Sequence, residues 1–142
     1  MQEISKVAVF IDQTEARLIR ETGGIPAFSG TVESDFESHP RYRGEGSNQA
    51  RFGRDPYHGS NNEYHENRLE AEIRKRYFHE LEKELLPFDE ILLFGPGEAR
   101  KEFHNYLLEQ PSFRKKKIHM QASDWLTDNQ LLEAAGLFFS MG

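Results

Sequence analysis

The apolar positions of the chain change their spacing several times, and each spacing predicts an element. Val7–Ile11 and Glu90–Phe94 are nearly continuous apolar runs of strand length, which is typical of strands buried on both faces. Ala16–Ile19 follows the first run after a short polar turn, so we expect these two strands to pair antiparallel. Ala27–Glu33 and Lys117–Ala122 complete the predicted strands.

Three other stretches have the spacing of amphipathic helices. In the longest, Glu63–Leu86, apolar residues recur about every four positions and a proline follows. A second helix is predicted at about residues 98–109, and a third runs to about Phe139. Thr127 and Gln130 have the spacing of a capping box at the start of that third helix.

The predicted order of elements is three strands followed by alternating helices and strands (βββαβαβα). Three consecutive antiparallel strands and two later βα units predict a mixed five-stranded sheet with helices on both faces. A ribonuclease H-like α/β fold has this order. We find no internal repeat and no linker, so residues 1–142 are predicted to form a single domain.

Between the first three strands and the longest helix, the hydrophobic periodicity stops. This arginine-rich segment, about residues 36–62, is predicted as a long loop and holds Arg41, Arg43, Arg51 and Arg54. Loops longer than about 12–15 residues are uncommon inside a compact domain and are usually functional or disordered. We therefore place the function here, with a disordered surface excursion as the alternative.

Charge and composition narrow the classes of function. The net charge of −6 argues against a protein that coats nucleic acid through bulk attraction, although a local phosphate contact stays open. The chain has no cysteine, which excludes disulfides and a thiol nucleophile. No apolar run approaches the roughly 18 residues of a membrane span. We expect a cytoplasmic protein without a cofactor.

Nuclease chemistry is the first candidate suggested by the fold. Ribonuclease H-like nucleases hold two metal ions about 3.5–4 Å apart with a cluster of carboxylates. Asp12 ends the first strand, where one such ligand belongs, but Gly95–Gly97 follows the fourth strand in place of an acid. We therefore interpret Asp12 as a turn residue. Asp55, His58 and His65 are an alternative metal group, but their spacing matches no known site, and we expect no metal.

Phosphate or RNA binding is the second candidate. The turn before the second predicted helix contains two glycines, so its backbone N–H groups can face a phosphate, and Gly97 and Lys101 are candidate RNA contacts. The simpler interpretation is that the glycines only serve the turn. In the arginine-rich segment, the guanidinium groups suit phosphate and Phe52 suits base stacking. Gln49 can orient a water or a carbonyl.

Three motifs occur in order along the predicted fold: Val9–Leu18, Gly44–Phe52 and Leu93–Phe103. Together they resemble the middle domain of the archaeal and eukaryotic class-one peptide chain release factors and their relative Pelota. The resemblance covers the chain from about Ile4 to Phe139 and suggests a bacterial branch of the family. It implies a ribonuclease H-like domain without nuclease activity.

In that family, a Gly-Gly-Gln tripeptide between the third strand and the first helix promotes hydrolysis of the peptidyl-tRNA ester. Gln49 matches the glutamine, whereas Ser47 and Asn48 replace the two glycines. The resemblance implies a translation-associated protein that binds the ribosome or tRNA through residues 41–54. A role in rescue of stalled complexes, in a termination-like step or in hibernation is consistent with this.

Two other functions stay open from the sequence. In one, the protein is a peptidyl-tRNA ester hydrolase with Gln49 as its catalytic residue, so enzymatic activity is undecided. In the other, it is a non-catalytic module that binds a protein partner through the acidic face of the long helix and through the last helix.

Overall fold

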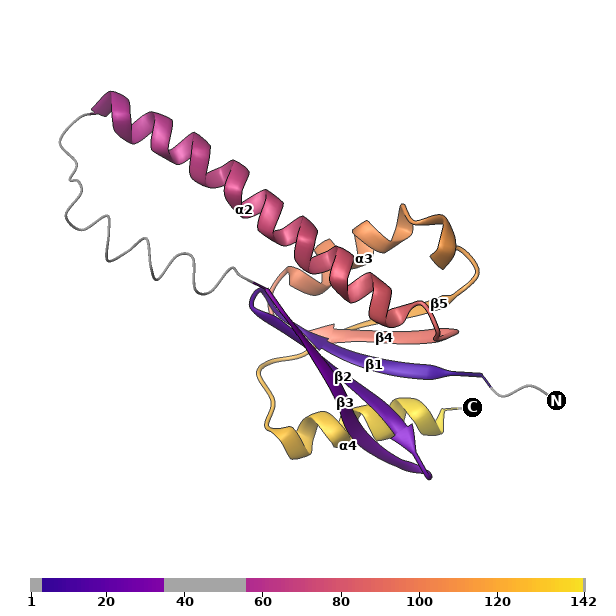
Figure 1. Cartoon of the computed structure of the whole chain (residues 1–142). Coiled ribbons are helices and arrows are strands. Elements are labelled where there is room, and N and C mark those ends of the chain that lie inside the picture. Colours follow the sequence, from indigo (N-terminus) through magenta and orange to yellow (C-terminus); the bar gives the residue numbers. More distant parts are fainter. Residues whose placement is uncertain (1–3, 35–55, 142) are drawn as a thin grey trace.

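A computed structural model describes residues 4–34 and 56–141, and side chains are described outside residues 56–67. The described residues form one five-stranded sheet in the order β3-β2-β1-β4-β5 (Figure 1). The strands are β1 (Lys6–Ile11), β2 (Glu15–Thr22), β3 (Ile25–Glu33), β4 (Glu90–Gly95) and β5 (Lys117–Ala122). The helices are α2 (Pro56–Leu85), α3 (Ala99–Leu108), the 3-10 turn η1 (Pro111–Phe113) and α4 (Asp128–Ser140).

The sheet is mixed. β2 pairs antiparallel with both β1 and β3, whereas β4 pairs parallel with both β1 and β5. Helices α2 and α3 cover one face and α4 covers the other (Figure 1). The predicted ribonuclease H-like fold, with a mixed five-stranded sheet and helices on both faces, is therefore confirmed.

The continuous apolar run of β1 is explained by two hydrophobic cores, one on each face. Val7, Val9 and Ile11 pack in the core beneath α2 and α3, and Ala8 and Phe10 pack in the core beneath α4. Because side chains alternate between the faces of a strand, a strand covered on both faces needs an apolar residue at every position. β4 has the same pattern for the same reason.

The long helix starts earlier than its apolar spacing predicts. α2 begins at Pro56 rather than at Glu63, so residues 56–62 belong to the helix and the predicted 36–62 loop is too long at that end. Proline is favoured in the first helical turn because its missing N–H has no partner there in any case. The apolar stripe begins only at Leu69, because the N-terminal half of α2 extends beyond the sheet (Figure 1).

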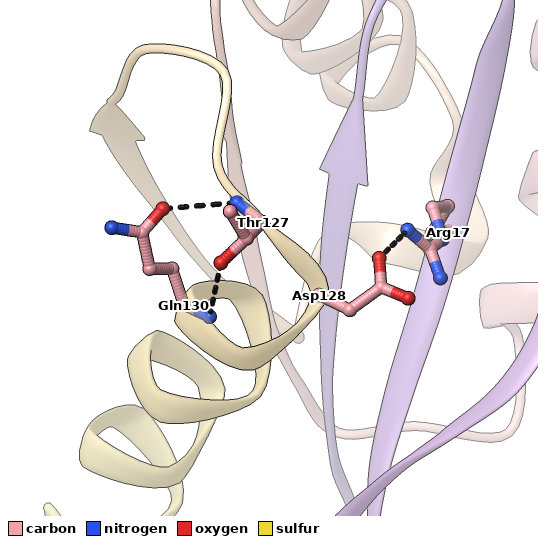
Figure 2. A network of polar contacts seen from close by, with 4 residues as sticks. All are labelled: Arg17, Thr127, Asp128 and Gln130. Atoms are coloured by element: carbon pink, nitrogen blue, oxygen red, sulfur yellow. Dashed lines mark hydrogen bonds and ion pairs between the residues drawn. The ribbon is translucent and has the colours of Figure 1, made fainter.

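The predicted capping box is present at the start of α4 (Figure 2). Thr127 Oγ1 accepts from the Gln130 N–H at 3.2 Å, and Gln130 Oε1 accepts from the Thr127 N–H at 2.9 Å. Asp128, the first helical residue, accepts a 2.7 Å hydrogen bond from Arg17 Nη1 of β2. That hydrogen bond lowers the pKa of Asp128. The start of α4 is thus capped by its own residues and tied to the sheet.

Two neighbouring leucines of α3 differ in burial, so their substitution should change the free energy of unfolding by different amounts. Leu107 is fully buried, whereas Leu108 is 61% exposed. We expect Leu107→Ala to lower the free energy of unfolding by about 2–5 kcal/mol, because it leaves a cavity in the core. Leu108→Ala, the matched control, should change it by less than about 0.5 kcal/mol. Urea unfolding followed by circular dichroism measures both, and equal losses would contradict this packing.

Candidate functional site

Several chain segments meet at one end of the sheet, where the parallel strands β1, β4 and β5 have their C-terminal ends (Figure 1). β3 also ends there, because it runs parallel to β1 two strands away, and Ser34 follows it directly. Ligands in open α/β sheets commonly bind outside the carboxyl ends of the strands. Ser34 is the last described residue before the segment 35–55, so this end of the sheet is the candidate site.

Asp12 forms the turn between β1 and β2. Its Oδ1 accepts hydrogen bonds from the Thr14 N–H at 2.7 Å, the Thr14 hydroxyl at 2.8 Å and the Glu15 N–H at 3.0 Å. A short side chain that accepts from backbone N–H groups two or three residues ahead is a turn-forming device. The prediction that Asp12 is a turn residue is therefore confirmed. The Thr14 carbonyl in turn accepts from the Ser34 N–H at 2.8 Å, which holds the end of β3.

Tyr77 ties α2 to the same turn. Its hydroxyl donates a 2.9 Å hydrogen bond to the backbone carbonyl of Asp12, and its ring is buried beside Phe78. Burial, together with the nearby carboxylates of Asp12 and Glu15, raises the pKa of Tyr77 well above its usual value. The phenol therefore stays protonated and keeps donating. This contact fixes where the long helix crosses the end of β1.

Gly95 and Gly97 shape the turn between β4 and α3. Gly95 has φ 148°, and a Cβ at this position would lie 2.3 Å from the backbone oxygen of Ile11. Only glycine allows the two parallel strands to approach this closely at their ends. Gly97 has φ 70°, in the left-handed region, and is exposed. The fourth strand thus ends in a backbone turn with no side chain at the position where a nuclease needs an acid.

Arg100 lies in the first turn of α3, and its buried side chain stabilises the preceding glycine turn through hydrogen bonds. Its Nη1 donates to the carbonyl oxygens of Gly97 at 2.8 Å and Gly95 at 3.3 Å. The residue is only 9% exposed. Lys101, the next residue, points to solvent with a side chain 54% exposed, and its ammonium lies 3.9 Å from Glu98.

Trp125 lies in the connection between β5 and α4, at the same end of the sheet. The centroids of its ring and the Phe10 ring lie 6.1 Å apart in an edge-on arrangement, yet Trp125 is 68% exposed. The Ser123 N–H donates to the Gly95 carbonyl at 3.2 Å, so this connection adjoins the glycine turn. An exposed tryptophan with one side fixed by packing is a rigid surface on which another flat group can stack.

The sequence-predicted contacts fall into two groups. Gly97 and Lys101 are brought together at the site. The others lie outside the described residues and stay predictions: Gln49, Arg41, Arg43, Arg51, Phe52 and Arg54. Sequence reasoning missed Trp125, and it did not assign the buried position of Arg100. Trp125 could have been noticed because it is an isolated tryptophan in a polar connection. The inward orientation of Arg100 could not, because the spacing of the apolar residues does not indicate it.

No group of three His, Asp or Glu side chains that could hold a metal ion occurs within the described residues. Asp55 and the side chains of His58 and His65 lie outside them. None of the helices in the described ranges combines the length and apolarity of a membrane span.

Known proteins resemble this chain in fold and, over part of its length, in sequence. No protein-family model matches it. A Pelota homolog from Methanocaldococcus jannaschii is 35% identical over 57 residues, which is 39% of this chain and 16% of that protein. The crystal structure of Archaeoglobus fulgidus Pelota matches with a TM-score of 0.57 at 12% identity, covering 94% of this chain and 31% of that one. The archaeal translation termination factor aRF1 matches with a TM-score of 0.52 at 13% identity, covering 94% and 34%.

The chain has the fold of one region of Pelota and aRF1. It spans about a third of the length of these solved relatives. The predicted resemblance is confirmed at the level of fold, and the sequence match supports it for Pelota over part of the chain. The bacterial branch and the correspondence to the middle domain of these proteins stay predictions.

The close approach at Gly95 can be tested by adding one methyl group. We expect Gly95→Ala to destabilise the protein by about 2–5 kcal/mol, because the new Cβ overlaps the Ile11 oxygen and the positive φ disfavours a side chain. Gly30→Ala is the control, since a Cβ at that position has no atom within 4 Å. It should be neutral or slightly stabilising in thermal and urea unfolding. A Gly95→Ala variant as stable as Gly30→Ala would refute the contact.

The Tyr77 hydrogen bond predicts a pH-dependent effect. At pH 7, Tyr77→Phe should cost about 1–2 kcal/mol, because the buried Asp12 carbonyl loses its donor. Above pH about 10 the unfolded chain releases this phenolic proton while the folded protein keeps it, so the wild type loses stability as pH rises. The cost of Tyr77→Phe should therefore shrink between pH 9 and 11, by up to about 1.4 kcal/mol per unit. Urea unfolding of both proteins across this range measures it, and a constant difference would contradict the assignment.

Proposed function

We propose that the protein is a translation-associated factor that binds the ribosome or tRNA through its arginine-rich segment. The observation that carries the proposal is the fold shared with Pelota and aRF1 over 94% of the chain, together with the 35% identical stretch in a Pelota homolog. The resemblance indicates a translation-related role. The chain spans about a third of the solved relatives, which fits a single domain equivalent to their middle domain.

The chemistry of the arginine-rich segment supports binding to an RNA backbone. Arg41, Arg43, Arg51 and Arg54 supply four cations in a chain whose net charge is −6, so attraction to RNA is local rather than general. Arginine forms two parallel hydrogen bonds with a phosphate. Phe52 adds a ring for base stacking. Ser34, the last described residue before this segment, follows β3 at the end of the sheet where β4 enters the glycine turn, so Gly97 and Lys101 are also proposed contacts.

The described residues support binding rather than phosphodiester cleavage. A nuclease of this fold uses carboxylates at the ends of β1 and β4 to hold metal ions. Oδ1 of Asp12 accepts three hydrogen bonds within its own turn, and β4 ends in Gly95, which has no side chain. The same scaffold can therefore present a binding surface without hydrolysing the RNA that it contacts.

Ribosome binding is tested with two double variants that remove the same charge. Arg51→Ala/Arg54→Ala should abolish co-sedimentation with ribosomes in sucrose gradients at low salt. Arg114→Ala/Lys115→Ala, the control, removes two exposed cations that precede β5 and so lie at the opposite end of the sheet. It should co-sediment like the wild type. Wild-type binding should weaken steeply between about 50 and 200 mM salt, because phosphate contacts release counterions.

The other outcomes separate the remaining functions. Binding to a purified protein partner that survives high salt, with no binding to ribosomes or tRNA, would replace this proposal with the interaction module. Release of peptide from peptidyl-tRNA on ribosomes, lost in Gln49→Ala, would add hydrolysis to binding. Equal sedimentation of the two double variants would remove the arginine-rich segment from the contact.

A further inference from the structure

The N-terminus of α3 is open, whereas that of α4 is capped. Glu98, the N-cap residue of α3, has φ −99° and ψ −8° and makes no side-chain capping hydrogen bond. Among the described residues, no acceptor receives the N–H groups of Gly97, Glu98, Ala99 and Arg100; the first N–H in this stretch with an acceptor belongs to Glu102. Unpaired N–H groups at the start of a helix carry its positive dipole end and favour an anion.

Arg100 is a second, independent observation that points to an anion as the ligand of this turn. It is about nine-tenths buried, and its Nε has no hydrogen-bond partner. Within the described residues its guanidinium forms no ion pair, and its two hydrogen bonds go to the carbonyls of Gly95 and Gly97. A buried charge without a counter-charge is costly, and a cation at a helix N-terminus is disfavoured by the dipole. Both costs fall if an anion binds at the turn.

The bracing by Arg100 also orients the turn. The carbonyls of Gly95 and Gly97 accept from the buried guanidinium. Pro96 follows Gly95 and has no N–H, so of the two peptide groups only the one between Gly97 and Glu98 carries an N–H, which points away from its carbonyl. The nearby carboxylates are exposed and face other cations: Glu98 lies 3.9 Å from Lys101, and Glu102 lies 3.6 Å from Arg74. Neither carboxylate forms an ion pair with the guanidinium of Arg100.

We propose that the turn Gly95–Arg100 is a seat for one phosphate group, and that the group is a backbone phosphate of an RNA strand. The N–H groups of Gly97, Glu98 and Ala99 donate to its oxygens, Arg100 orients the turn and supplies charge from beneath, and Lys101 approaches from solvent. The choice of RNA rests on the proposed function. The phosphate seat itself rests on the open N-terminus of α3 and on the buried guanidinium of Arg100, whose Nε has no hydrogen-bond partner.

The seat is tested by nitrogen-15 NMR of the whole protein at constant ionic strength. The amides of Gly97, Glu98 and Ala99 should shift saturably with a short single-stranded RNA, and more weakly with inorganic phosphate. The capped N-terminus of α4 is an internal control, so the amide signals of Asn129 and Gln130 should not shift. Arg100→Gln should weaken binding about tenfold or more. Lys101→Gln removes an exposed cation and should weaken binding by a smaller factor. This second variant tests the seat if Arg100→Gln does not fold.

Each of the other outcomes contradicts one part of the proposal. No saturable shift at the glycine turn, or equal shifts at α3 and α4, removes the seat while leaving ribosome co-sedimentation untouched. Shifts with inorganic phosphate alone remove RNA as the ligand. Unchanged affinity in a folded Arg100→Gln variant removes the role of Arg100. Failure of ribosome binding with an intact RNA-dependent shift would instead overturn the proposed function and keep the seat.

Discussion

The parallel pairing of β1 with β4, buried on both faces, is the constraint on which the rest of this structure depends. Five residues of β1 and five of β4 are buried, and each strand contributes to two cores. Removing this much apolar surface from water is the main favourable term in folding. It also forces the two strands to end side by side, where Gly95 meets Ile11 without room for a side chain. The connections that follow β1, β3, β4 and β5 leave the sheet at that end.

The scaffold could be predicted from the sequence because its elements depend on local patterns. The apolar run Val7–Ile11 and the Thr127–Gln130 box each reflect one physical rule, and both appear as expected. The start of α2 at Pro56 was missed because the apolar stripe reports only the half that packs on the sheet. A helix that extends beyond its support leaves no hydrophobic signal over that length.

The candidate site was harder to predict because it depends on contacts between distant or unexpected partners. The hydrogen bond between Tyr77 and the Asp12 carbonyl joins residues 65 positions apart, and no spacing rule relates them. Arg100 follows a glycine turn and faces inward onto two carbonyls, an orientation that the spacing of the apolar residues does not indicate. Gly97 and Lys101 could be proposed as contacts from the sequence because a glycine turn before a helix is recognisable there, and they stay predictions.

Trp125 gives the molecule a built-in optical reporter. It is the single tryptophan of the chain, and it stands largely in water while one edge rests on Phe10. Excitation of indole therefore samples one location, next to the Ser123–Gly95 contact. Any large molecule that covers this end of the sheet would move the emission toward shorter wavelengths without a dye or a tag.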